Sequence, residues 1–206
     1  MKESTLIEFT EVLASRQPVP GGGGASALAG ALAASLAAMV GNLTSGKKKF
    51  AESEEERNRL IEQAEQLRLQ LLDGIDEDAD AFYPLSQAYS LAKDDPAREA
   101  TMEKCLREAA GAPLKILTLA DQVLDVLEKM LPISSRLAIS DIATAAALAE
   151  GCLKGAAVNV LVNSELMKDR QYADKLDEQT DRLLSGGCRR ARRIYKQVTE
   201  RMKSHG

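Results

Sequence analysis

The chain has 206 residues and a net charge of −4, with 45% hydrophobic, 28% charged and 3% aromatic residues and no tryptophan. This composition is typical of a globular chain that buries one sizeable core. Proteins that bind single-stranded nucleic acid stack bases on aromatic rings, so the scarcity of aromatic residues argues against that class, and we expect no nucleic-acid partner.

The few cysteines and the single histidine exclude several kinds of site. Cys105, Cys152 and Cys188 are scattered and odd in number, which indicates reduced thiols and a cytoplasmic protein. Without a histidine and cysteine cluster a zinc site is not expected, and His205 alone is a poor base for a serine or cysteine nucleophile. Any chemistry therefore falls to carboxylates, lysines, hydroxyls, amides and backbone dipoles.

A short helix is predicted first along the chain. Thr5 and Glu8 form the pattern of a capping box, in which each side chain accepts a bond from the other residue's backbone N–H. Leu6, Phe9 and Leu13 follow at helical spacing, so we expect all three to be buried. The segment "RQPVPGGGG" then ends this helix.

An uncharged, alanine-rich helix is predicted over residues 24–45, with Gly46 as its C-terminal stop. Its small side chains permit close packing on neighbours, which indicates the central helix of the fold. Residues 25–43 also form the only stretch long enough to span a membrane. Alanine gains little from lipid, so we expect no membrane span.

The rest of the chain is predicted to form four long helices. A capping box at Ser53 and Glu56 begins one that continues to about residue 92, kinked by Pro84. Asp95 begins the next, which should be kinked or interrupted near Pro113. The last two are expected over residues 136–167 and 172–202, with a distortion of the final helix at 185–187. Because strand signals are scarce, the sequence predicts an all-α antiparallel bundle of about six helices, some long and proline-kinked, in one domain over residues 1–206.

The run Gly21, Gly22, Gly23 and Gly24 is the first candidate site. A helix N-terminus presents unpaired N–H groups and a positive dipole end, and glycines let a ligand approach the backbone. The run lacks the lysine of a phosphate-binding P-loop, and no strand precedes it as in a dinucleotide-binding fingerprint. It predicts either a site for an anion or polar heterocycle, or a tight turn that lets two helices touch.

Lys47, Lys48 and Lys49 follow the second helix. At 1.5 Å per residue they lie about 35 Å from the glycines, too far to share a small ligand within one chain. An antiparallel dimer would bring the two ends together, and the alternative is a solvated turn. A second basic stretch, residues 168–206, holds eleven basic and six acidic residues and predicts either an anion-facing surface or a solvated helix face.

Three segments resemble one known family. The segment "PVPGGGGASALAGALAASLAAMVGNLTSGKKKF" is similar to the opening of the cyclodeaminase/cyclohydrolase family. The segment "DEDADAFYPLSQAYSLAK" matches its Asp-x-x-Ala-Phe motif through Asp78, Ala81 and Phe82. The segment "SDIATAAALAEGCLKGAAVNVLVN" matches its Ser-Asp helix, which ends in Gly-Ala-x-x-Asn-Val-x-x-Asn. The order and spacing are kept over about residues 5–170.

The resemblance implies an all-helical homodimer that acts on a tetrahydrofolate substrate with no metal or cofactor. The expected reaction is hydrolysis of 5,10-methenyltetrahydrofolate to 10-formyltetrahydrofolate. Many family members with deaminase activity carry asparagines shortly before the Ser-Asp pair, where this chain has "ISSRLAISD", and this departure favours the cyclohydrolase branch. The alternatives are a cyclodeaminase that releases ammonia from formimidoyltetrahydrofolate and a non-catalytic helical dimer that binds folate or another anion.

Two aspartates are the candidate catalytic residues. The reaction needs a base for water and a group that stabilises positive charge, and a carboxylate whose pKa is raised by apolar helix walls can do both. Asp141 lies in a helix rich in alanine, isoleucine and leucine, where an unpaired charge is costly, and its alternative role is a helix cap. Asp78 lies in the acidic run "DEDAD", where the alternative is a solvated face.

The remaining candidates would bind the substrate. Asn159 and Asn163 lie four residues apart on one helix face, where their amides suit the edge of a pterin or, alternatively, bond to neighbouring helices. Ser26 would bind substrate or cap its helix, and the lysines would hold the glutamate tail of folate. The full predicted set is Gly21, Gly22, Gly23, Gly24, Ser26, Lys47, Lys48, Phe82, Asn159 and Asn163.

Overall fold

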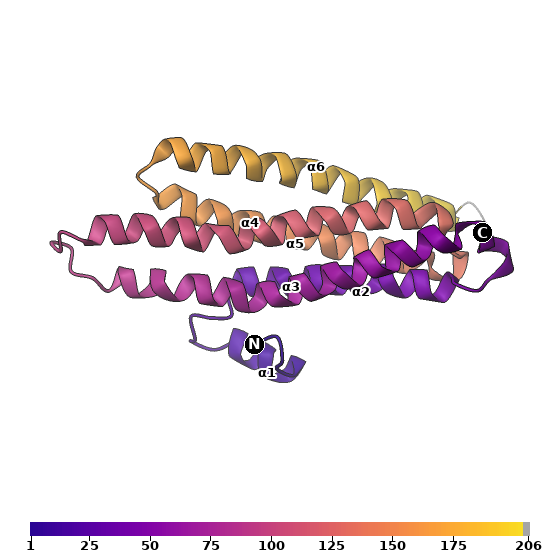
Figure 1. The fold of residues 1–206 in the computed structure, drawn as a ribbon, viewed down its shortest axis with the longest axis horizontal. Coiled ribbons are helices and arrows are strands. Elements are labelled where there is room, and N and C mark those ends of the chain that lie inside the picture. The colour runs from indigo at the N-terminus through magenta and orange to yellow at the C-terminus, as the bar shows by residue number, and fades with distance from the viewer. Residues whose placement is uncertain (204–206) are drawn as a thin grey trace.

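The computed structural model describes residues 1–203 (Figure 1). They form six α-helices and three short 3₁₀ turns, joined by connections. No strand occurs in this part, so the predicted all-α fold of about six helices is confirmed. His205 lies outside the described residues. The elements are α1 (Leu6–Leu13), α2 (Gly22–Thr44), η1 (Lys48–Ser53), α3 (Glu54–Tyr89), α4 (Arg98–Met130), η2 (Leu131–Ile133), η3 (Arg136–Ala138), α5 (Ile139–Leu166) and α6 (Arg170–Lys203).

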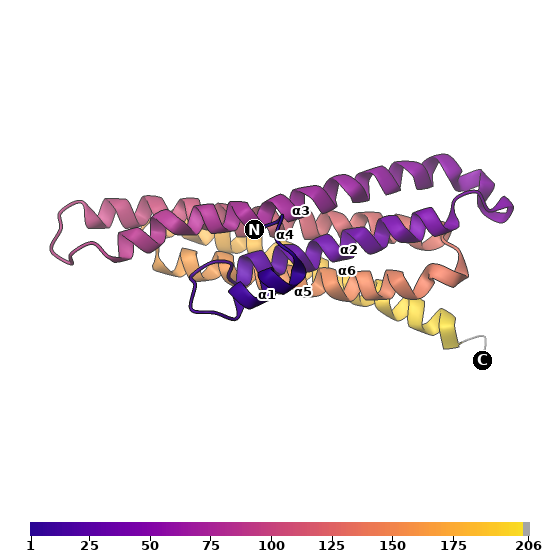
Figure 2. The same cartoon turned by 90° about the horizontal axis from the view of Figure 1, so that it is seen from below.

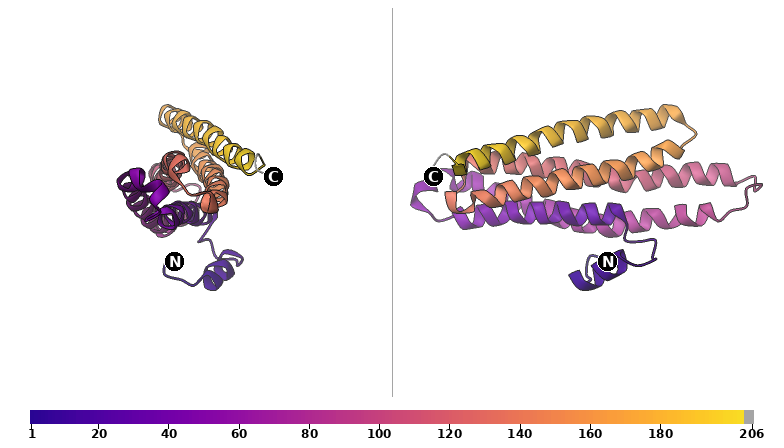
Figure 3. Two further views of the ribbon diagram at one scale, coloured as in Figure 1. Left: turned by 90° about the vertical axis from the view of Figure 1, so that its right-hand side faces the viewer. Right: turned by 180° about the vertical axis from the view of Figure 1, so that it is seen from behind.

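Helices α2 to α5 form a bundle in which successive helices run in opposite directions (Figure 1). Helix α2 packs on α3 and α5, and α4 packs on the same two helices. Helix α6 covers α4 and α5 on the outside, and the views along and behind the bundle show it on the side away from α1 (Figure 3). Helix α1 stands off from the bundle on a short connection (Figure 1), and in the view from below it lies in front of α2 and α5 (Figure 2).

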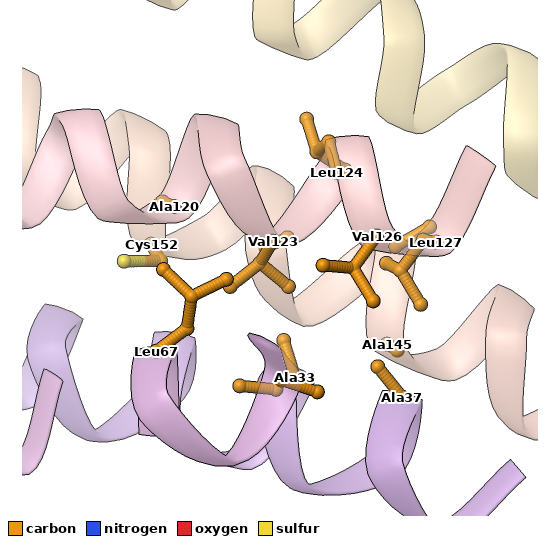
Figure 4. Close-up of a cluster of buried hydrophobic side chains, with 14 of the residues drawn as sticks. Ala33, Ala37, Leu67, Ala120, Val123, Leu124, Val126, Leu127, Ala145 and Cys152 are labelled. Carbon is orange, nitrogen blue, oxygen red and sulfur yellow. The ribbon is translucent and has the colours of Figure 1, made fainter. Parts of the chain in front are cut away.

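The core depends on the small residues of α2, as the sequence predicts. Ala33, Ala37 and the facing Ala145 of α5 are fully buried among larger side chains of α3 and α4 (Figure 4). A Cβ atom built on Gly41 would lie 2.4 Å from Cγ1 of Ile61, so α2 and α3 approach too closely there for any side chain. Close backbone approach is therefore what the alanine and glycine content of α2 provides.

Two details of the predicted helices differ from the structure. The capping box of Thr5 and Glu8 is present, but only Phe9 of α1 is buried, and Leu6 and Leu13 are exposed, because α1 contacts the bundle over a narrow face. The predicted capping box at Ser53 is wrong. The 3₁₀ turn η1 runs directly into α3, and the Ser53 side chain makes no cap bond.

The prolines and glycines inside the long helices do not break them. Pro84 lies inside α3 and Pro113 inside α4, and both helices continue past them. Helix α6 continues through Gly186 and Gly187, so the predicted distortion there does not end or divide it. Helix α4 begins at Arg98, two residues later than the predicted first position.

A fully buried arginine, Arg57, holds the far end of the bundle together. Its guanidinium donates to the backbone carbonyls of Phe50 at 3.1 Å and Ile133 at 3.3 Å. It also donates to Ser45 Oγ at 3.4 Å and pairs with Glu54. This one side chain therefore joins the connection after α2, helix α3 and the connection before α5.

The basic residues of α6 serve mainly within the chain. Arg190 pairs with three acids on α4: Asp121 at 2.8 Å, Asp125, and Glu128 at 3.0 Å. Arg192 pairs with Glu150 of α5 at 3.0 Å. These pairs attach α6 to the acidic side of the bundle, so an anion-facing role for this basic stretch is not supported by its geometry.

Two segments, Gly22–Thr44 and Arg136–Leu166, are long and apolar enough to cross a membrane by length and composition alone, so the prediction of residues 25–43 as the only such stretch is wrong. Core helices of bundles pass the same test. Within the most apolar 18 residues of each segment, 61% and 44% of the residues are buried in the bundle. Each helix therefore packs against the core on one face and is exposed on the other.

Candidate active site

The main candidate site is a cavity of about 180 Å³ at the N-terminal end of α2. Helix α2 has only 23 residues, whereas α3 has 36 and α4 has 33, so the bundle lacks one wall beyond Gly22. The cavity occupies this gap. Its walls are the connection before α2, the C-terminal parts of α3 and α5, and the N-terminal half of α4. Its lining residues are Pro18, Val19, Gly21, Gly22, Asp78, Phe82, Leu85, Tyr89, Ala109, Pro113, Asn159, Val162, Asn163 and Leu166.

The carboxylate of Asp78 lies directly against the glycine turn. A Cβ atom built on Gly23 would be 2.1 Å from Oδ1 of Asp78 and 2.4 Å from Oδ2, closer than any side chain tolerates. A Cβ atom on Gly22 would be 3.0 Å from Nδ2 of Asn159. The absence of a side chain at Gly23 therefore leaves the space that the Asp78 carboxylate occupies, and a side chain at Gly22 would press on the amide of Asn159.

The electrostatic setting of Asp78 is that of a half-buried acid without a counter-charge. Burial raises the pKa of this carboxyl group above its ordinary value, and the backbone N–H of Gly24 acts in the opposite direction. No ion pair within residues 1–203 involves the Asp78 carboxylate. A bound cation would supply the missing partner, so the site favours a positively charged ligand.

The two predicted asparagines line the same cavity from α5. Asn159 Nδ2 donates to the carbonyl of Gly155 at 2.8 Å, and Asn163 Nδ2 donates to the carbonyl of Asn159 at 2.8 Å. With the amides assigned in this way, the Oδ1 atoms remain as acceptors for ligand N–H groups. The four-residue spacing thus places two amide acceptors on the cavity wall.

The cavity also has apolar walls, and Phe82 is the one residue of these walls among those predicted from the sequence. Tyr89, Val162, Leu166 and Pro113 line it as well. Tyr89 lies on the same face of α3 as Asp78 and Phe82, and Val162 and Leu166 continue the face of Asn159, so helical spacing was a usable signal for these three. Pro113 carried no such signal, because its position depends on how α4 packs.

Ser26 lies next to the site without lining it. Its hydroxyl donates to the carbonyl of Gly22 at 2.7 Å, and a Cβ atom built on Gly155 would be 2.1 Å from its Oγ. Ser26 is buried between α2 and α5. Its position fits the alternative of a residue that stabilises the first turn of α2.

Lys47, Lys48 and Asp141 lie at the opposite end of the bundle from Asp78. Lys47 Nζ donates to Ser135 Oγ at 3.2 Å in the connection before α5. Asp141 is in the first turn of α5, about 27 Å along the helix from Asn159. Within one chain, therefore, the structure brings together the glycines, Asp78, Phe82 and both asparagines. Lys47, Lys48 and Asp141 of the same chain lie far from this group.

The described residues offer no group of three or more histidine, cysteine, aspartate and glutamate side chains arranged to hold a metal ion. The three cysteines are buried and unpaired, and burial raises the pKa of Cys152 to about 12. A thiolate nucleophile is therefore disfavoured at that position. The polar chemistry of the cavity is carried by one carboxylate, two amides and the backbone of the glycine turn.

These features define an all-helical protein with a small-molecule site in which a half-buried acid faces a helix N-terminus. A family model described as formiminotransferase-cyclodeaminase matches residues 5–182. The chain therefore belongs to the formiminotransferase-cyclodeaminase family, which confirms the resemblance drawn from the three motifs.

Similar proteins carry two kinds of name. The methenyltetrahydrofolate cyclohydrolase of Methylorubrum extorquens is 36% identical over 202 residues, which cover 96% of this chain and 97% of that protein. The formimidoyltransferase-cyclodeaminase of Mus musculus is 31% identical over 186 residues, which cover 88% of this chain but 34% of that protein. The chain thus spans about a third of the mouse protein.

A solved structure has the same fold. The formiminotetrahydrofolate cyclodeaminase of Thermotoga maritima superposes with a TM-score of 0.84 at 29% sequence identity. The superposition covers 96% of this chain and 98% of the Thermotoga chain. The bundle is therefore shared over essentially the whole of both chains.

Proposed function

We propose that this chain is a methenyltetrahydrofolate cyclohydrolase, which hydrolyses 5,10-methenyltetrahydrofolate to 10-formyltetrahydrofolate. The observation that carries the proposal is the unpaired, half-buried Asp78 carboxylate against the glycine turn, in a cavity whose ligand would be a cation. Similarity to the Methylorubrum cyclohydrolase over nearly the full length of both chains supports it.

The cavity residues suit the proposed substrate. The one-carbon bridge between N5 and N10 is a planar amidinium cation, so it would lie against Asp78, which has no other counter-charge. The pterin ring carries N–H donors, and the Oδ1 atoms of Asn159 and Asn163 would accept from them. Phe82 and Tyr89 would pack on the flat rings.

Asp78 would then act as the base. A water molecule attacks the bridge carbon while the Asp78 carboxylate takes one of its protons, and a neutral tetrahedral adduct forms. The protonated Asp78 returns its proton to N5 as the bond between the carbon and N5 breaks. The remaining hydroxyl loses its proton to solvent, leaving a formyl group on N10 and one proton released overall. A raised pKa lets one carboxyl group accept and return the proton near neutral pH.

The direct test is the loss of methenyltetrahydrofolate absorbance with purified protein. Turnover well above the buffer rate supports the proposal, and no acceleration by folded protein refutes it.

Cyclodeaminase activity is the second candidate, because the mouse and Thermotoga proteins bear that name. It would use the same acid to expel ammonia from 5-formimidoyltetrahydrofolate. The stretch "ISSRLAISD" lacks the asparagines of many deaminating members, which favours the cyclohydrolase. Ammonia release, measured beside the absorbance assay, distinguishes the two activities. Binding of folate with neither activity would indicate the third alternative, a non-catalytic helical dimer.

We further propose that the chain forms a homodimer through the outer faces of α2 and α5. Helix α2 contains no charged residue, yet Leu32, Met39 and Leu43 are exposed on it. Val158 and Val162 are exposed on the neighbouring α5. Exposed apolar side chains on an uncharged helix and on the helix beside it are typical of an interface. The exposed apolar residues of α1, which stands off from the bundle, would add to it (Figure 1).

An antiparallel pairing of these faces would bring the two ends of the bundle together. Helix α2 is about 35 Å long and separates the glycine turn from Lys47. Rotation of the partner about an axis perpendicular to α2 would place Lys47, Lys48 and Asp141 of the partner subunit near the cavity. Roles for these three residues in catalysis or substrate binding remain predictions that depend on this pairing.

Three further expectations stay predictions: a single domain over residues 1–206, a cytoplasmic location, and the absence of a cofactor or a nucleic-acid partner. The names of the similar proteins are those of metabolic enzymes, which supports the enzyme class proposed here.

A further inference from the structure

A second cavity adjoins the candidate active site at its outer end. It measures about 540 Å³ and lies in the angle between the α3–α4 connection, the start of α4 and the end of α5. We propose that this groove binds the aminobenzoyl-glutamate end of the folate substrate, with Lys93 and Arg98 as the partners of the glutamate carboxylates. The inference rests on the proposed function and adds residues that determine the affinity for the tail.

The size of the first cavity requires an extension. At about 180 Å³ it is smaller than the range of about 300–1,000 Å³ typical of sites that enclose drug-sized ligands. It holds a pterin and its one-carbon bridge, but not the benzoyl ring and glutamate as well. Part of the substrate must therefore lie outside it.

The two cavities are continuous at their shared walls. Tyr89 of α3 and Leu166 of α5 line both of them. The glycine turn and Asp78 line another part of the first cavity, where the bridge would react. The tail of the substrate starts at N10 of the bridge and must leave this cavity, and the walls shared at Tyr89 and Leu166 would lead it into the groove within one subunit.

The groove presents apolar surface before its charges. Met102 and Leu106 of α4 line it beside Tyr89 and Leu166. Leu106 belongs to a buried hydrophobic cluster to which α3, α4, α5 and α6 contribute, and Met102 packs on that cluster, so the bundle fixes the positions of both side chains. An aromatic ring that leaves the first cavity would lie on these side chains, and the glutamate would continue beyond them.

Two of the three cations that line the groove, Lys93 and Arg98, are available, whereas its acids are engaged. Glu99 pairs with Lys168 at 2.5 Å. Glu103 accepts from the backbone N–H of Lys168 at 2.7 Å and from Arg107. Asp95 likewise accepts from the backbone N–H of Ala97 at 2.8 Å.

Lys93 makes no ion pair within residues 1–203, and in the same part of the chain the Arg98 side chain donates only through Nε, to the carbonyl of Leu91 at 3.3 Å. The Lys93 ammonium and the outer guanidinium nitrogens of Arg98 remain to bind carboxylates.

The test compares 5,10-methenyltetrahydrofolate with 5,10-methenyltetrahydropteroate, which lacks the glutamate. The quantity measured is the ratio of kcat/KM for the two substrates, from the absorbance assay. The wild type should prefer the folate by about tenfold, and Lys93→Ala and Arg98→Ala should each lower the ratio about threefold. Lys104→Ala, which removes an exposed cation of α4 outside the groove, is the matched control.

The outcomes separate this inference from the proposed function. Wild-type protein that turns over neither substrate refutes the function. A wild-type ratio near one, or a ratio that survives Lys93→Ala/Arg98→Ala, refutes the groove assignment while the function stands. If the preference for the folate disappears in Lys47→Ala/Lys48→Ala but persists in Lys93→Ala/Arg98→Ala, the groove assignment is wrong and the tail belongs to the lysines of the partner subunit. Weaker binding of free p-aminobenzoyl-glutamate to the groove variant, measured by calorimetry, is the expected result without turnover.

Discussion

Substitution of Gly23 by alanine should inactivate the enzyme while leaving the fold intact. The new Cβ atom would lie 2.1 Å from Oδ1 of Asp78, whereas real Cβ atoms stay at least 3.0 Å from other heavy atoms. The carboxylate must therefore move by about 1 Å, and a displacement of that size costs about 10²-fold in rate for a positioned catalytic group. Alanine is favoured over glycine in helices by up to about 1 kcal/mol, so the helix itself gains stability.

The assay is kcat/KM from the loss of methenyltetrahydrofolate absorbance, with the melting temperature measured in parallel. Gly186→Ala is the matched control, because a Cβ atom there meets nothing within 4 Å and the residue lies on α6, away from the cavity. In the background of Asp78→Asn, Gly23→Ala should cause little further loss, because both changes act through one carboxylate. Full activity of Gly23→Ala, or independent losses in the double variant, would refute the assigned geometry.

Three further changes test other parts of the account. Asp78→Asn should raise the melting temperature at pH 7. Burial raises the pKa of Asp78 in the folded chain, so the wild type loses stability as this group ionises, and the variant does not. The difference in melting temperature should vanish at a pH below the ordinary pKa of 3.8, where the group is protonated in both the folded and the unfolded chain. An Asp78→Asn protein less stable than wild type at pH 7 would contradict this. Arg57→Met should lower the free energy of unfolding by about 3 kcal/mol in urea denaturation, since it leaves two carbonyls unpaired, and a loss below about 1 kcal/mol would argue against the clamp. Leu32→Glu should convert a dimer to a monomer by light scattering, whereas Leu69→Glu, equally exposed on α3, should not. An unchanged mass for Leu32→Glu would exclude the proposed interface.

The helices were predictable because their signals are local. The uncharged run of α2, the capping box at Thr5 and the apolar spacing of α3 each specify a helix without knowledge of the rest of the chain. Exact ends were less predictable. Ser53 has the right sequence for a cap, yet the buried Arg57 binds the carbonyl of Phe50 and holds the preceding residues in a 3₁₀ turn.

The site was predictable only in part, for a physical reason. Asp78, Phe82 and the two asparagines belong to motifs, and helical spacing puts each set on one face. The helix faces that meet at the cavity are set by the different lengths of α2 and its neighbours. These lengths are not encoded in any single motif, so the motifs did not predict the outer walls of the cavity or the adjoining groove. The grouping of Asp141 with Asp78 requires a second subunit, which no pattern within one chain can specify.

The most direct test of the central claim is the dependence of kcat/KM on pH for wild type and Asp78→Asn, with methenyltetrahydrofolate as substrate. If Asp78 is the base, wild-type kcat/KM rises with pH along a limb whose midpoint lies above the ordinary aspartate pKa of 3.8. Asp78→Asn should lose that limb and about 10²–10⁴-fold of the rate. An Asp78→Asn protein that keeps both the rate and the limb would show that the carboxylate at the glycine turn does not carry the reaction.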